Sequence, residues 1–381
     1  MSYFENTGKP FKEVDARVEL IAQLERILTH TPPSTDFASR SRGHGLYSGI
    51  RSTSFLFCRL SKLYPELKVR GLRLERIARS YLDAASPTAA DSPDPSHCGI
   101  ANELLLNLTL KVLLNEGKIA IDNARNLCSY AETILRTNHP DSSSNEWLYG
   151  RAGYLYFLRT VYQHLQSVDG ATARTVYETM RRVAAGISAA PYPWTWHGKA
   201  YLGGAHGLVG IITQIVLSFP ESASSMTKQL SGLLALQSTT SGNFPSSLPP
   251  HGDRLVQFCH GAPGFIASLS SLRPYFPDLQ DRIDASLARA RECVWERGLL
   301  TKNPCLCHGI SGNAVVLGSE GRTRTFLSFT TREALQEIDY RGDDHGIDGY
   351  LGLYSGEAGR AWAWAVMDLE LFDKFIGYND I

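Results

Sequence analysis

The sequence predicts an all-α protein built from helical hairpins that repeat along the chain. Glycine-paired motifs recur about every fifty residues, which is the length of two helices and two loops. Each motif leads into an apolar run with helical periodicity. No long run of alternating β-branched residues indicates a sheet. Together these observations favour repeated pairs of helices over any mixed or all-β architecture.

The first expected element is an amphipathic helix over residues 12–28, before the first glycine motif. Val14, Val18, Ile21 and Leu28 would share one face of it. We expect an outer helix here, followed by a polar loop at 31–43 that contains two prolines.

Seven glycine motifs then open seven expected inner helices. Their first glycines are Gly45, Gly99, Gly150, Gly207, Gly261, Gly309 and Gly356. Each inner helix should be followed by an outer one; in the Gly150 repeat, Val176, Met180 and Val183 lie in helical register for it. In the sixth repeat Gly318 and Gly321 follow closely, so its inner helix is expected to be short.

Seven such hairpins could stack as an open solenoid or close into a double-layered ring. Neither end of the sequence reads as a polar capping repeat, which favours closure. The predicted fold is therefore an α/α-toroid of seven helical hairpins, forming a single domain over residues 1–381. Glycines at the helix starts would let those starts crowd together at one rim.

Composition narrows the range of partners. The chain has 38 basic and 38 acidic residues and a formal net charge of zero. Without a basic run, nothing indicates nucleic acid, and a small molecule or a peptide is the expected partner. No apolar run reaches the length of a membrane span and no signal peptide is evident, so we expect a cytoplasmic protein with no transmembrane segment.

Two motifs carry the residues with the most distinctive chemistry, "FCHGAPG" at 258–264 and "CLCHGISGN" at 305–313. If the helices that follow them are neighbours, Cys259, Cys307 and His308 would converge. Two thiolates and one imidazole can hold zinc with a fourth position open. The alternative is a pair of buried cysteines and a helix-capping histidine. Cys305 competes with Cys307, and His260 would close the site if it also bound.

These motifs resemble those of the lanthionine synthetase C-like family, and specifically its eukaryotic branch. The resemblance rests on "EWLYGRAGY", "GAHGLVGI", "SGNFPS", "CHGAPG" and "LLTKNPCLCHGISGNA", in the order of that branch. It implies a seven-hairpin α/α-toroid and zinc (Zn²⁺) held by Cys259, Cys307 and His308. It also implies addition of a thiol to dehydroamino acids, with glutathione as the co-substrate in the eukaryotic branch.

The resemblance assigns further residues to the chemistry. His206 would do acid/base work, for which a histidine that titrates near pH 7 is suited; the alternative is a helix-capping histidine. Glu146 stands where bacterial members carry an acidic catalytic residue, although it could instead be a loop carboxylate that pairs with Arg151.

Three basic residues are candidates for binding the glutathione carboxylates. Lys302 matches a lysine of the eukaryotic glutathione pocket, with a solvated loop lysine as the alternative. His345 stands where that branch has an arginine, and Arg341 is a nearby substitute. Arg254, five residues before Cys259, is another possible carboxylate or phosphate clamp.

The expected function is zinc-dependent addition of glutathione to dehydroalanine or dehydrobutyrine residues in proteins or peptides. The main alternative is a non-catalytic scaffold or signalling protein that binds zinc and glutathione. Two enzyme classes on related toroids remain as well: prenyl transfer, which needs an aspartate on the zinc, and glycoside hydrolysis, which needs two opposed carboxylates.

Overall fold

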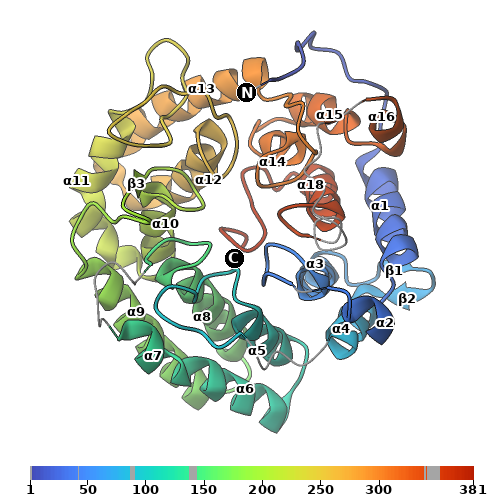
Figure 1. Ribbon diagram of the computed structural model, residues 1–381, viewed down its shortest axis with the longest axis vertical. Helices are drawn as coiled ribbons and strands as arrows, with labels where there is room; N and C mark the ends of the chain where they lie inside the picture. The colour runs from blue at the N-terminus through green and yellow to red at the C-terminus, as the bar shows by residue number, and fades with distance from the viewer. Residues whose placement is uncertain (1, 42, 86–90, 137–143, 339, 341–351) are drawn as a thin grey trace. The chain divides into compact units, whose positions relative to one another are not determined.

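The protein is all-α, as the sequence predicted. The computed structural model describes residues 2–41, 43–85, 91–136, 144–338, 340 and 352–381. The strands within these residues are short: β1 (Lys68–Val69) pairs antiparallel with β2 (Leu72–Arg73), and β3 (Ala200–Tyr201) with β4 (Ser247–Leu248). Helices make up nearly all the other regular structure of the described residues (Figure 1).

The chain forms two compact units, each made of separate stretches of sequence. Unit 1 contains the described residues of Met1–Leu24, Lys199–His345 and Tyr354–Asp380. Unit 2 contains those of Glu25–Gly198, Gly346–Leu353 and Ile381. The single domain over residues 1–381 stays a prediction.

Unit 2 has two layers of helices, and each of its inner helices follows a glycine motif. The inner layer places α5 between α3 and α8, and each inner helix packs against the outer helix that follows it. The inner helices are α3 (Ile50–Leu63), α5 (Glu103–Leu113) and α8 (Arg151–Leu165); the outer helices are α4 (Leu74–Ala84), α6 (Gly117–Ser129) and α9 (Gly170–Ser188). Unit 2 also contains two short helices, α2 (Thr35–Ala38) and α7 (Ala131–Leu135).

Unit 1 repeats the arrangement for three of its four inner helices; residues 369–381 contain no helix, so the outer helix predicted after the Gly356 motif does not form there. The inner helices are α10 (Leu208–Ser218), α12 (Ala262–Leu272), α14 (Ile310–Val315) and α18 (Glu357–Asp368); the outer helices are α11 (Ala223–Leu234), α13 (Gln280–Arg297) and α15 (Glu320–Ser328), followed by α16 (Arg332–Glu337). Single 3₁₀ turns lie at Pro220–Ser222, Arg273–Tyr275 and Pro277–Leu279. The short inner helix predicted for the sixth repeat is confirmed, since α14 has six residues and Gly318 follows at φ +70°.

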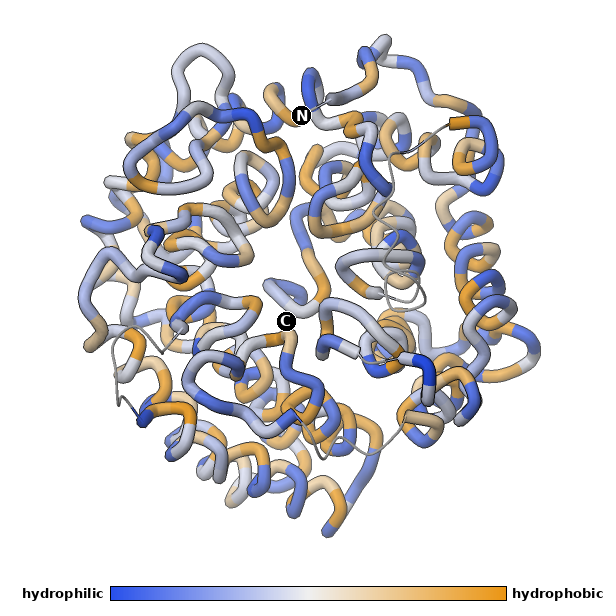
Figure 2. The backbone as a smooth tube through the Cα atoms, in the orientation of Figure 1, coloured by the Kyte–Doolittle hydropathy of each residue, from blue (hydrophilic) through white to orange (hydrophobic). Residues whose placement is uncertain are grey.

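Burial separates the two kinds of helix. In α8 every side chain from Arg151 to Val161 is buried, as expected for a helix surrounded by protein. The outer helix α9 buries Val176, Met180 and Val183, the three residues predicted from their register. The outer helices accordingly carry both hydrophilic and hydrophobic stretches along their length (Figure 2).

The N-terminal helix forms as predicted, but its buried face is different. Helix α1 spans Ala16–His30 and buries Leu20, Leu24, Ile27 and Leu28. These positions follow i, i+4, i+7 and i+8, which makes a wider and more apolar stripe than the predicted face. Val18, predicted to lie on the buried face, is 62% exposed.

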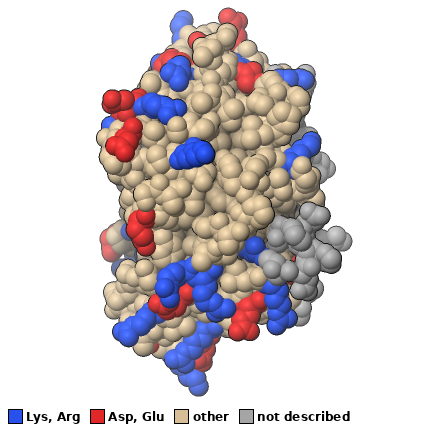
Figure 3. Space-filling view, turned by 90° about the vertical axis from the view of Figure 1, so that its left-hand side faces the viewer, with Lys and Arg blue, Asp and Glu red and all other residues tan. Residues whose placement is uncertain are grey.

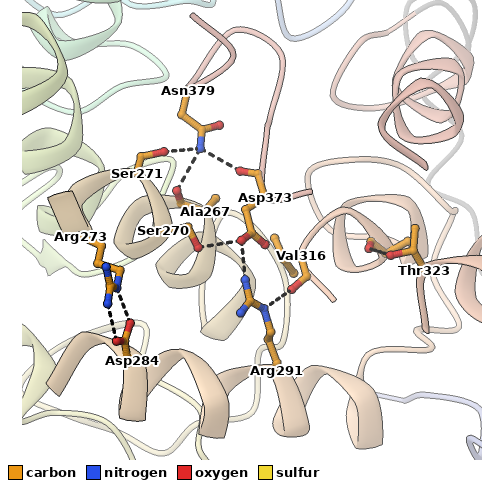
Figure 4. Close-up of polar contacts among 11 residues, drawn as sticks. Ala267, Ser270, Ser271, Arg273, Asp284, Arg291, Val316, Thr323, Asp373 and Asn379 are labelled. Atoms are coloured by element: carbon orange, nitrogen blue, oxygen red, sulfur yellow. Dashed lines mark hydrogen bonds and ion pairs between the residues drawn. The ribbon is translucent and has the colours of Figure 1, made fainter. Parts of the chain in front are cut away.

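The last residues of unit 1 run through its interior. Asp373 accepts a hydrogen bond from Ser270 at 2.7 Å and pairs with Arg291 of α13 (Figure 4). Asn379 is fully buried and donates to the carbonyl of Ala267 in α12 at 2.9 Å (Figure 4). Residues 373–379 therefore tie α12 to α13 within this unit.

The charged surface gives no single-sign field on the face drawn in Figure 3, where Lys and Arg are interspersed with Asp and Glu. Among the described residues, every helix is too short or too polar to cross a membrane.

Candidate metal and thiol site

The two cysteine motifs of unit 1 lie side by side, as predicted. Each forms a turn that ends in a glycine N-cap, Gly261 before α12 and Gly309 before α14. The backbone N–H of Cys259 donates to the carbonyl of Cys307 at 3.3 Å. The N–H of Cys307 donates in turn to the carbonyl of Tyr354 at 3.0 Å. Two segments almost fifty residues apart thus meet through their own backbones.

The thiols of Cys259 and Cys307 are in hydrogen-bond contact. This contact lowers the pKa of Cys259 well below its ordinary value, against the opposing effect of burial, and the nearby imidazoles of His260 and His308 assist. The side-chain amide of Gln257 also donates to the Cys259 sulfur, with Nε2 at 3.0 Å from Sγ. The surroundings of Cys259 therefore favour its thiolate form, which is the form that binds metals.

A second sulfur–imidazole pair lies beside the first. Burial opposes ionisation of Cys305, but the charge of His308 and a hydrogen bond between the two side chains lower the pKa of Cys305 overall. The charge of Cys305 in turn raises the pKa of His308 to about 9. Cys305 is fully buried, whereas Cys259 and Cys307 keep 7% and 6% of their surface exposed. Of these three cysteines, only Cys259 and Cys307 are accessible to solvent.

The donor set fits zinc, although the described side chains show no formed metal-binding group. Two cysteines in contact and a histidine beside them are the ligand types of an open zinc site. Within the described ranges, no three Cys, His, Asp or Glu side chains are arranged to hold a metal. Zinc ligation by Cys259, Cys307 and His308 therefore stays a prediction.

Three rings lie next to the Cys259 turn. The ring centroids of His206 and His260 are 5.9 Å apart, and Tyr201 lies 6.1 Å from His206 and 5.4 Å from His260. Burial lowers the pKa of His260, against the opposing effect of the Cys259 charge, and its buried Nδ1 has no hydrogen-bond partner. The structure thus brings the predicted acid/base residue His206 to the cysteine site. Its role in proton transfer is a prediction.

Glu146 lies in unit 2 and is engaged in a turn. Its carboxylate accepts hydrogen bonds from the backbone N–H of Leu148 at 2.7 Å and of Tyr149 at 2.5 Å, and from the Ser144 hydroxyl at 3.3 Å. Arg151 donates to Asn145 and Ile134. These bonds are those of a carboxylate that caps the loop before α8, and catalysis by Glu146 stays a prediction.

A basic pocket lies in unit 1, close to the cysteines. It has a volume of about 390 Å³ and is lined by Ser246, His251, Gly252, Arg254, Leu255 and Lys302. Among the described residues, no carboxylate is part of this lining. Lys302 is near enough to His308 to disfavour its protonation. The structure therefore brings together Arg254 and Lys302, two of the three residues predicted to bind the carboxylates of glutathione. The third, Arg341, lies outside the described residues, as does His345.

The ring of Phe258, next to Cys259, is held by aromatic neighbours from the end of unit 1. It stacks on Phe375 with centroids 4.4 Å apart and lies edge-on to Tyr378 at 5.1 Å. Tyr354, whose carbonyl binds the Cys307 N–H, is 5.6 Å away. The cysteine turn is therefore supported from a part of the chain about one hundred residues later.

Glycine lets neighbouring turns approach this closely, as the sequence predicted. A Cβ on Gly203, ahead of α10, would lie 2.2 Å from the carbonyl oxygen of Cys259. A Cβ on Gly264 would lie 2.2 Å from the carbonyl oxygen of Phe258 and 2.8 Å from the nitrogen of Gly204. Any side chain at these positions would push the turns apart.

Sequence reasoning missed Gln257 and Tyr201. Both are common residue types in unremarkable contexts, and only their contacts with Cys259 and His260 give them significance. The position of Gln257, two residues before the cysteine, was the one visible signal.

Comparison with known proteins identifies a family and two relatives. The family model for lanthionine synthetase C-like proteins matches residues 41–367. The chain is 31% identical to the LanC-like protein GCL1 of Arabidopsis thaliana over 258 residues, which are 62% of this chain and 58% of that protein. It is 32% identical to the glutathione S-transferase LANCL1 of Danio rerio over 186 residues, 45% of each chain. The chain thus spans about half the length of these two relatives. Because the family match extends over most of the sequence, this chain belongs to the lanthionine synthetase C-like family.

Proposed function

We propose that this protein adds glutathione to dehydroalanine or dehydrobutyrine residues of proteins or peptides, using zinc held by Cys259, Cys307 and His308. The observation that carries the proposal is the contact between the Cys259 and Cys307 thiols close to a pocket lined by cationic side chains. The similarity to a protein named glutathione S-transferase supports the choice of thiol.

The proposed metal would bind the incoming thiol and lower its pKa, so that thiolate is present at neutral pH. Cys307 is the preferred second sulfur ligand because it contacts Cys259 and is not fully enclosed. Gln257 would keep its hydrogen bond to the Cys259 sulfur and so fix the direction of that ligand.

The pocket would hold the carboxylates of glutathione. Arg254 and Lys302 both line it, and the adjacent Asp253 carboxylate is occupied by Ser241 and by Arg297 at 3.3 Å. The positive charge of the pocket is therefore left for a ligand. Charge-assisted hydrogen bonds from an arginine and a lysine suit carboxylates.

Addition forms one C–S bond and consumes the carbon–carbon double bond of the dehydroamino acid. The thiolate attacks the β-carbon, the electron pair moves toward the carbonyl, and the α-carbon then takes a proton. His206 is the proposed source of that proton, since it lies beside the cysteine site with His260 and Tyr201. Glu146 is proposed to assist.

The proposal is tested by incubating the protein with glutathione and a dehydroalanine peptide and following the mass gained by the peptide. We expect His206→Ala to slow addition by about 100-fold or more, which is the usual contribution of a positioned general acid. Glutathione and zinc binding should persist in this variant. Addition at the wild-type rate would remove His206 from the mechanism.

Lys302→Ala and Arg254→Ala should raise the KM for glutathione by roughly tenfold each, because each removes one charge-assisted hydrogen bond. The KM for the dehydroalanine peptide should change little. The matched control is Lys228→Ala on the outer helix α11, which should leave both constants unchanged. An equal loss for both substrates would show that the pocket does not select the thiol.

A zinc- and glutathione-binding scaffold remains the second candidate. It is favoured by the bonds of Glu146, which are those of a structural residue. If wild-type protein binds zinc and glutathione but adds no mass to the peptide, the scaffold function replaces the enzymatic one.

A further inference from the structure

Two buried asparagines hold the segment that leads into Cys259. They close the two S-G-N triplets of the chain, Ser241-Gly242-Asn243 and Ser311-Gly312-Asn313. Both side chains are completely buried. A buried amide must place its donors on acceptors to offset the cost of losing water.

The side chain of Asn243 hydrogen-bonds to the backbone on both sides of Arg254. Its Nδ2 donates to the carbonyl of Asp253 at 2.7 Å and to that of Leu255 at 2.9 Å. Its Oδ1 accepts from the N–H of Ala262 at 2.7 Å, the first residue of α12. The N-cap of this helix, Gly261, has no side chain to do so. One amide thus ties the backbone around Arg254 to the helix that follows the Cys259 turn.

Asn313 reaches the same segment from the other cysteine motif. It lies in α14, which follows Cys307 and His308, and its Nδ2 donates to the carbonyl of Val256 at 3.0 Å. The second donor binds the carbonyl of Gly298 at 2.9 Å. Asn313 therefore links the Cys307 helix to the residues just before Cys259.

The geometry points to Asn243 and Asn313 as positioning residues: Asn243 sets the shape of the Cys259 turn and the direction of Arg254, and Asn313 sets the separation of the two cysteine segments. This inference rests on the proposed function, because it concerns how the proposed zinc and thiol sites are held. Between them the two amides fix the carbonyls of residues 253, 255 and 256. Neither asparagine would touch the metal or the substrate.

The two roles differ in a measurable way. Loss of Asn313 should loosen Cys259 relative to Cys307, and loss of Asn243 should loosen the Cys259 turn itself, so both should weaken zinc binding. Only Asn243 brackets Arg254, so only its loss should also weaken glutathione binding. If the two asparagines had a purely structural role, their loss would lower stability without affecting zinc binding and glutathione binding differently.

Unit 2 offers a matched control. Asn102 is fully buried, its Nδ2 donates to the carbonyls of Asp91 and His97, and its Oδ1 accepts from the N–H of Leu105 in α5. It makes the same three kinds of bond as Asn243, but in the unit without the cysteine motifs.

The experiment compares Asn243→Ala, Asn313→Ala and Asn102→Ala in the full chain. Zinc affinity is measured by competition with a chelator, the KM for glutathione by peptide addition, and stability by thermal unfolding of the metal-free protein. We expect zinc affinity to fall roughly 10-fold in the Asn243 and Asn313 variants, the lower end of the range for outer-shell partners, because neither amide bonds directly to a proposed ligand. Asn102→Ala should lower the unfolding temperature while zinc affinity stays at the wild-type value. The KM for glutathione should rise for Asn243→Ala alone.

If an alanine variant does not fold, the corresponding serine variant, which keeps a short hydroxyl donor, is measured instead. Unchanged zinc affinity in the Asn243 and Asn313 variants, with normal zinc binding by the wild type, would overturn this inference and leave the proposed function standing. An equal loss in Asn102→Ala would also overturn it, because the effect would then be one of general stability. A wild-type protein that binds no zinc would overturn the proposed function itself, and the inference with it.

Discussion

Cys307→Ala is expected to abolish stoichiometric zinc binding and, with it, glutathione addition. The substitution removes one of three proposed ligands and the sulfur that contacts Cys259. Loss of a direct ligand should cost more than the roughly 100-fold upper limit seen for outer partners. Metal content after dialysis, measured by atomic emission or mass spectrometry, checks the first effect, and the peptide assay checks the second.

Cys305→Ser is the control for this experiment, because Cys305 lies two residues away and contacts His308. It is fully enclosed, so we expect zinc to remain bound and addition to continue at a reduced or normal rate. Retention of zinc by Cys307→Ala and its loss from Cys305→Ser would reassign the ligand to Cys305.

Gly261→Ala is expected to destabilise unit 1 by about 2–6 kcal/mol. Gly261 has φ +110°, a conformation that an alanine adopts only with strain of about 1–3 kcal/mol. The added Cβ would also lie 2.0 Å from the carbonyl oxygen of Leu255 and 2.9 Å from Oδ1 of Asn243. Relieving that overlap costs roughly another 1–3 kcal/mol. Urea unfolding of the metal-free protein measures the difference.

Gly232→Ala separates this effect from a general response to replacing glycine. Gly232 lies on the exposed face of α11, and a Cβ there would meet no atom within 4 Å. Alanine should be neutral or stabilise the helix by about 0.5–1 kcal/mol. Equal stability of the two variants would contradict the geometry of the Gly261 turn.

The fold class followed from short-range signals. Gly150 and Gly207 could be recognised as helix starts because each glycine directly precedes an apolar run in the sequence. The short length of α14 could be predicted from the position of Gly318. The prediction of the buried face of α1 was wrong because two overlapping apolar stripes share that helix. Only the elements that pack against the helix determine which stripe is buried. The interior path of residues 373–379 gave no local signal, since its contacts are with helices far away in the sequence.

The site was predictable where chemistry and position coincide. Cys259 and Cys307 could be paired because each directly precedes a glycine motif, and the structure brings them together. Gln257 and Asn243 could not be assigned, since an amide acts through whichever carbonyl, N–H or sulfur it reaches. The contact between His308 and Cys305 depends on side-chain orientation, which spacing does not determine.

The discontinuity of unit 1 bears on how the protein matures during synthesis. Both cysteine turns leave the ribosome before Tyr354, Phe375 and Tyr378, whose rings surround Phe258. Domains usually fold as units as their chain emerges. The packing around Phe258 can therefore be completed only after translation has supplied these aromatic residues.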